Sequence, residues 1–190
     1  MHEHRSIIRL LYPAVEYTLD PPGYERLRDW TFLLFQINYT ANELRFLKDN
    51  KPKLYDEDNF HQHFSRFCAA MVTYGRCFAD AAPGMVSLDG KDVFKAKPNL
   101  KTIHDRMLDI RNGVFAHTGR DELMRVTLAV REEPDGKTVS VKHLLTPVLP
   151  YADFDRYLEV VSHVEREAII KVNKYINHFE TTLGKEIRVP

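Results

Sequence analysis

An arginine, an asparagine and a histidine lie close together in residues 111–117, which read RNGVFAH. An arginine guanidinium binds a phosphate through two parallel hydrogen bonds and stabilises negative charge on it. A histidine with a pKa near neutrality accepts and returns protons, and an asparagine amide orients either group. Arg111, Asn112 and His117 are therefore the candidates for catalysis at a phosphate ester.

The spacing of this stretch complicates a site within one chain. It falls in the last two turns of a helix that we predict over residues 99–118, and Arg111 and His117 are six positions apart. On a regular helix, that separation is about 120° around the axis and about 9 Å along it, so the two side chains do not share a face. Either the helix is distorted near Gly113, or two chains share the site, or His117 only caps the helix end, where the dipole favours a charged histidine.

The stretch resembles the signature of HEPN domains, in which an arginine and a polar residue are followed, after several variable residues, by a histidine. Here Asn112 is the polar residue, and five residues separate Arg111 from His117. Asp109 before the stretch and Thr118 after it resemble the AbiU2-like branch, which is found near toxin and phage-defence genes. The resemblance extends to architecture, because HEPN domains are helical bundles that carry this motif late in a long helix.

The resemblance implies a metal-independent endoribonuclease without a cofactor, acting as a toxin or phage-defence effector on an RNA substrate. His117 would be the general acid or base, Arg111 would stabilise the scissile phosphate, and Asn112 would orient them. The motifs of two protomers would face each other across the axis of a homodimer whose interface includes the third helix. An antitoxin or regulatory protein is a further expected partner. Because many HEPN domains are non-catalytic, the alternative is a bundle that binds a partner protein or nucleotide.

Other histidines suggest weaker sites. His61 and His63 diverge by about 200° on a helix, so we expect both at the surface. His104, Asp105 and His163 would meet only in a bundle core, and the sequence has no Glu-x-x-His or His-Glu-x-x-His spacing. We therefore expect no metal site.

The whole chain has the composition of one cytoplasmic domain, residues 1–190. Its formal net charge is zero, which argues against a general nucleic-acid binder. It has no signal-peptide core and no apolar run of membrane-spanning length, so we expect no membrane contact. Cys68 and Cys77 are nine positions apart on one predicted helix, about 13 Å, which is too far for a disulfide and typical of reduced thiols.

Four segments carry apolar residues three and four positions apart, the periodicity of amphipathic helices: 24–49, 59–81, 99–118 and 153–183. We expect Asn99 to cap the third helix and Gly184 to end the fourth. The second helix should place an aromatic stripe in the core: Phe60, Phe64, Phe67, Met71, Tyr74 and Phe78.

A β-hairpin is predicted between the third and fourth helices, over residues 124–145, with a Pro-Asp-Gly turn at 134–136. Two strands alone are marginally stable, so the hairpin should pack on the bundle or pair with another chain. The predicted fold is therefore all-α, a four-helix HEPN-like bundle with a small β-hairpin inserted before the last helix.

Overall fold

The computed structural model describes residues 24–51, 57–80, 85–116, 124–134, 136, 139–147, 149–184 and 186. The predicted class is confirmed, because helices dominate these ranges and a two-stranded antiparallel hairpin precedes the last helix. The helices are α2 (Glu25–Asp49), α3 (Glu57–Arg76), α4 (Gly90–Val93), α5 (Pro98–Ile110) and α6 (Phe154–Leu183). A π-helical segment, η1 (Arg111–Ala116), continues α5, and the strands are β1 (Met124–Glu132) and β2 (Val139–Pro147).

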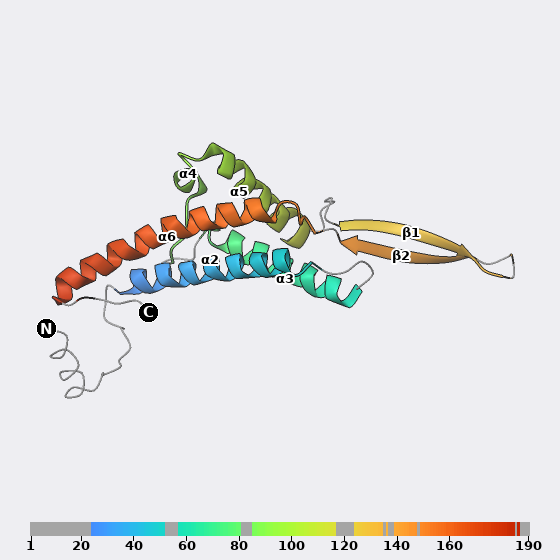
Figure 1. Ribbon diagram of the computed structural model, residues 1–190, viewed down its shortest axis with the longest axis horizontal. Coiled ribbons are helices and arrows are strands. Elements are labelled where there is room, and N and C mark those ends of the chain that lie inside the picture. The colour runs from blue at the N-terminus through green and yellow to red at the C-terminus, as the bar shows by residue number, and fades with distance from the viewer. Residues whose placement is uncertain are drawn as a thin grey trace, which may run out of the picture.

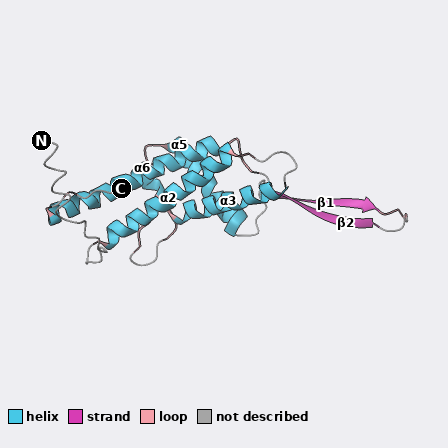
Figure 2. Ribbon diagram, turned by 60° about the horizontal axis from the view of Figure 1, so that its bottom comes forward, coloured by secondary structure: helices cyan, strands magenta, loops and turns pink. Residues whose placement is uncertain are grey.

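Helices α2 and α6 run antiparallel along the length of the bundle (Figure 1). Tyr24, at the start of α2, stacks on Phe179 near the end of α6, with ring centroids 4.0 Å apart. At the other end, Lys48 of α2 pairs with Asp155 of α6. Helix α3 packs on α2, and α5 packs against α3 and α6, so the four long helices enclose one core (Figure 2).

The core confirms the predicted stripes. Phe67, Met71 and Tyr74 of α3 are fully buried, while Phe60, Phe64 and Phe78 are partly buried against the same cluster. The last turn of α6 departs from the apolar periodicity: Leu183 is 43% exposed, because this turn extends past the neighbouring helices. Gly184 ends the helix in the left-handed conformation, as expected.

The helix ends differ from the sequence prediction where the chain makes tertiary contacts. Helix α3 ends at Arg76 instead of residue 81, because the Cys77 carbonyl accepts a hydrogen bond from the Leu88 amide at 2.8 Å. Helix α5 begins at Pro98, with Lys97 rather than Asn99 at the N-cap. Proline is suited to the first turn, because its fixed φ is helical and its missing N–H has no partner there.

Between α3 and α5, where the sequence predicts no helix or strand, the structure contains the short helix α4. The Asp89 carboxylate caps it by accepting a hydrogen bond from the Lys91 amide at 2.7 Å. Such a cap satisfies an amide that has no partner within the helix. The cap therefore stabilises a helix of only four residues.

The hairpin extends from one end of the bundle (Figures 1 and 2). Its strands pair from Met124 opposite Pro147 to Glu132 opposite Val139, two residues beyond the predicted end of the insertion. At the turn, the Gly136 amide donates to the Glu133 carbonyl, and Gly136 has a φ of +63° that favours glycine. No helix in the described ranges is long and apolar enough to cross a membrane.

Candidate functional site

The candidate motif begins where α5 stops being a regular α-helix. Arg111, Asn112 and Gly113 open the π-helical segment η1, in which hydrogen bonds skip one residue more than in an α-helix. Gly113 favours such a break, because glycine has low helix propensity. The structure therefore confirms the interpretation that the helix is distorted near Gly113. Short π-helical segments occur frequently at functional sites, since they redirect side chains from the regular helical positions.

The Arg111 side chain crosses α3 at a buried glycine. A Cβ atom at Gly75 would lie 3.0 Å from Arg111 Cγ, 3.2 Å from Cδ and 3.3 Å from Nε. These distances are shorter than most Cβ contacts, so an alanine at position 75 would push the Arg111 stem aside by a few tenths of an ångström. Glycine inside a helix destabilises it by about 1 kcal/mol relative to alanine. Gly75 thus creates the space that orients Arg111.

Among the described residues, the guanidinium of Arg111 is hydrogen-bonded to the side chain of its sequence neighbour alone. Its Nη1 donates to Asn112 Oδ1 at 2.7 Å, and its side chain is partly exposed. Its remaining N–H groups donate to no other described residue, and no described carboxylate forms an ion pair with it. An arginine held in this way has donors left for the planar oxygens of a phosphate or carboxylate.

The structure brings together two of the predicted site residues. Arg111 and Asn112 are adjacent and hydrogen-bonded, whereas Asp109 is exposed on α5 and bonds to neither of them. His117 and Thr118 lie outside the described residues. Gly75 was not among the residues predicted from the sequence, although a glycine within a helical pattern often marks a close approach.

The histidines considered as metal ligands have structural partners. His104 Nδ1 lies 2.7 Å from the Tyr74 hydroxyl, and His163 Nε2 donates to the Val93 carbonyl at 2.9 Å. Both rings contact Phe94, at centroid distances of 4.6 Å and 5.4 Å. Burial lowers the pKa of His104 to about 4, so the ring is neutral at physiological pH. The described residues contain no group of three or more potential ligands that could hold a metal ion.

Both His61 and His63 were expected at the surface; this prediction is confirmed for His61 and wrong for His63. His61 is exposed, but His63 is buried, and its Nδ1 lies 3.2 Å from the Tyr151 hydroxyl. Tyr151 comes from the segment before α6, so this burial depends on a contact distant in sequence. Burial also raises the pKa of Tyr151 to about 12.

The two cysteines are free, as predicted. Burial raises the pKa of Cys68 to about 11 and that of Cys77 to about 12. Both thiols are therefore protonated near neutral pH, and neither is an activated nucleophile.

No family model, curated protein or solved structure matches this chain.

Proposed function

We propose that the chain is a metal-independent endoribonuclease of the HEPN type, acting as a toxin or phage-defence effector in a homodimer. The observation that carries the proposal is the state of Arg111. Its stem is held in the space above Gly75, its guanidinium bonds to Asn112, and its other donors engage no described residue. An oriented cation of this kind is what stabilising a phosphate in a transition state requires.

In the proposed reaction, the 2′-hydroxyl of a ribose attacks the adjacent phosphorus. His117 removes the proton from that hydroxyl as the new bond to phosphorus forms. The bond from phosphorus to the 5′-oxygen breaks, and this oxygen receives a proton from a histidine of the shared site. The products are a cyclic phosphate and a 5′-hydroxyl. Arg111 stabilises the charge that develops on the non-bridging phosphate oxygens.

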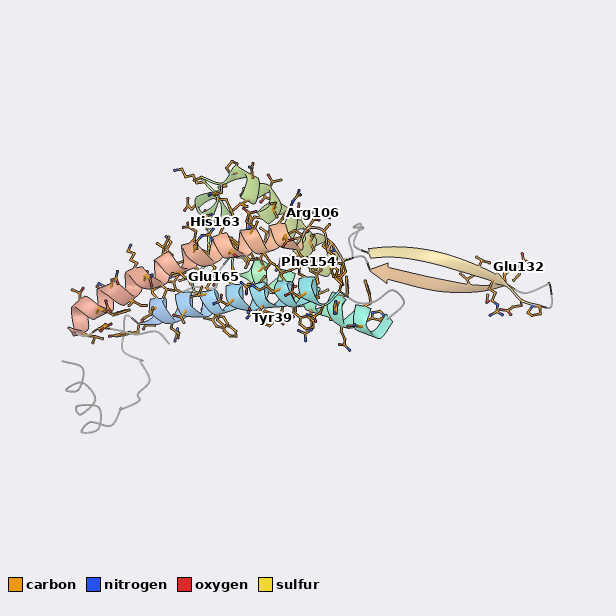
Figure 3. All side chains as sticks on the ribbon, viewed as in Figure 1. Tyr39, Arg106, Glu132, Phe154, His163 and Glu165 are labelled. Atoms are coloured by element: carbon orange, nitrogen blue, oxygen red, sulfur yellow. The ribbon has the colours of Figure 1, made fainter. Side chains whose placement is uncertain are left out.

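The test is cleavage of single-stranded RNA by purified protein in the presence of a chelator. Wild-type protein should produce fragments ending in cyclic phosphates, whereas Arg111→Ala and His117→Ala should lose at least about 100-fold in rate. Arg106→Ala is the matched control, because Arg106 is an exposed arginine on the same helix (Figure 3). A folded His117→Ala protein with wild-type activity would exclude the proposed reaction.

A non-catalytic binding module is the second candidate, favoured by the exposed valines of the hairpin. Val130, Val139 and Val141 are 63%, 57% and 53% exposed, respectively. Val130 pairs with Val141, so these side chains belong to one face of the hairpin, as does Val139 two positions earlier. An exposed apolar face on a two-stranded hairpin is typical of a protein-binding surface. Absence of RNA cleavage by the wild-type protein would favour this candidate.

A further inference from the structure

The short helix α4 lies over two buried histidines that come from two different helices. His104 of α5 and His163 of α6 are 2% and 7% exposed, respectively. Figure 1 shows α4 beside α5 and next to α6, and Phe94, directly after α4, contacts both imidazole rings. A buried imidazole destabilises a fold unless its polar atoms have partners. The partners of these two rings therefore connect α4 to the bundle.

Helix α4 is attached to the bundle by three contacts. Before its first turn, the Leu88 amide donates to a carbonyl at the end of α3 at 2.8 Å. At its last residue, the Val93 carbonyl accepts a hydrogen bond from His163 Nε2 at 2.9 Å. Between these points, Gly90 packs on the ring of the α5 histidine. A helix of only four residues does not persist without such contacts. We call residues 88–94 the α4 strap.

The contact at Gly90 leaves one nitrogen of His104 without a hydrogen-bond acceptor. A Cβ atom at Gly90 would lie 2.8 Å from His104 Nε2, so the strap approaches this edge of the ring closely because residue 90 is glycine. The other nitrogen, Nδ1, lies 2.7 Å from the Tyr74 hydroxyl. A charged imidazole carries a hydrogen on both nitrogens. Among the described residues, none accepts a hydrogen bond from Nε2, so the attached strap favours the neutral ring.

The surroundings of His104 also disfavour its charged form. Burial is the largest effect and lowers its pKa to about 4. Asp105 and Lys101, on the same helix, act on this pKa in opposite directions and pair with each other. Helix α3 faces the ring with the Tyr74 hydroxyl and a phenylalanine, and the strap faces it with a glycine and a phenylalanine. On α6, His163 donates its hydrogen bond to the strap.

We propose that the α4 strap is an acid-sensitive latch, which is released from the bundle when His104 takes up a proton. Release moves Gly90 away from Nε2, so water can accept the second hydrogen of the charged ring. The hydrogen bond from His163 Nε2 has its donor in both charge states of that ring, so it holds the strap independently of pH. Because the strap links α5 to α6, its release removes one attachment of α5 while the direct contacts between the long helices remain. The latch does not depend on the ribonuclease proposal.

Hydrogen exchange of the wild-type protein, measured by NMR at pH 7 and pH 5, tests the latch. The amides of Leu88, Val93 and Phe94 report on the strap, and the amide of Leu44 reports on the core of α2. The strap amides should be less protected than the core amide at both pH values, because the strap opens without the bundle. The pKa of His104 is about 4 when the strap is attached, and its ordinary value is 6.5. Protection of the strap amides, corrected for intrinsic exchange rates, should therefore fall by about 20-fold from pH 7 to pH 5.

Two results of this experiment would overturn the proposal. Equal protection of the strap amides and the core amide would mean that the strap opens only when the whole fold unfolds. Strap protection that does not change between pH 7 and pH 5 would mean that opening leaves His104 covered.

Two variants separate the proton on His104 from the hydrogen bond of His163. His104→Phe should remove the pH dependence of strap protection, because phenylalanine binds no proton. His163→Phe is the matched control, because it removes the hydrogen bond to Val93 and leaves His104 in place. It should lower strap protection by the same factor at both pH values and keep the change of about 20-fold between them. A change of that size in the His104→Phe protein would assign the effect to another group and contradict the latch.

A further pair of variants tests the contact itself and does not require replacing a buried histidine. Gly90→Ala places a Cβ atom 2.8 Å from His104 Nε2, so it should lower strap protection at pH 7 and leave the Leu44 amide unchanged. Lys91→Ala is the control, because Lys91 is exposed on the same short helix and its truncation should not change strap protection. Equal strap protection in the two variants would show that the close approach of Gly90 does not hold the strap, and would overturn the proposal.

Discussion

Gly75 and Arg111 lie 36 positions apart in the sequence and touch in the fold. Gly75 lies in the last turn of α3, where it provides the space for an arginine side chain that crosses the helix. Glycine has no Cβ atom, and the Arg111 side chain occupies the space that a Cβ at residue 75 would fill. The position of the guanidinium in the proposed reaction therefore depends on the residue type at position 75. Neither residue reveals this relationship by itself.

We predict that Gly75→Ala lowers RNA cleavage by about tenfold, because the added methyl group displaces the Arg111 side chain and small misplacements of a catalytic group are costly. The melting temperature should not fall correspondingly, since alanine improves the helix propensity of α3 by up to about 1 kcal/mol. In an Arg111→Ala background, Gly75→Ala should have no further effect on cleavage. An independent loss in the double variant would mean that Gly75 acts through another group.

At the scale of elements, α3 joins α2 to α5. It contacts α2 and α5, and its Phe67 packs against Phe154 of α6 with ring centroids 5.7 Å apart. The buried stripe of α3 was predictable, because burial of an amphipathic helix follows from the spacing of its apolar residues. The end of α3 at Arg76 and the burial of His63 were not, because each depends on a partner from a distant part of the chain.

We predict that Phe67→Ala destabilises the fold by about 3–5 kcal/mol, because it removes a fully buried ring and leaves a cavity. Val72→Ala on the same helix is the control, since Val72 is 37% exposed and its truncation should change stability by less than about 0.5 kcal/mol. Urea unfolding followed by circular dichroism measures both changes. A small effect of Phe67→Ala would contradict its assigned place in the core.

At the scale of the whole molecule, the sequence predicted the class and order of elements better than the site. Helical periodicity and the Pro-Asp-Gly turn are local signals, and they led to the bundle and the hairpin. The site depends on contacts between residues distant in the sequence. Arg111 was predicted from its motif, but Gly75 was not, because only the fold brings it next to Arg111. His117 lies outside the described residues, so the ribonuclease assignment stays a prediction.

The stability of the whole fold should decrease in mild acid because of His104. Its pKa is about 4 in the folded protein, below the ordinary value of 6.5, so the unfolded chain binds its proton more readily. The contribution of neutral His104 to the free energy of unfolding is fully present above pH 6.5 and is lost as pH falls toward 4. At pH 5 the loss relative to pH 7 should be about 2 kcal/mol.

Urea unfolding of the wild-type and His104→Phe proteins at both pH values measures this difference. The variant should be less stable at pH 7, because the buried Tyr74 hydroxyl loses its partner, but its stability should depend less on pH. Identical pH dependence in the two proteins would assign the acid sensitivity to other groups.

The pairing of the hairpin strands also limits how the length of this arm can change during evolution. Side chains alternate between the two faces of a strand, so one residue added to each strand would exchange the faces of every position beyond the insertion. Two residues added to each strand would lengthen the arm by about 7 Å and keep Val130 and Val141 on the same face. We therefore expect homologous arms to differ in reach by such steps, with the bundle unchanged.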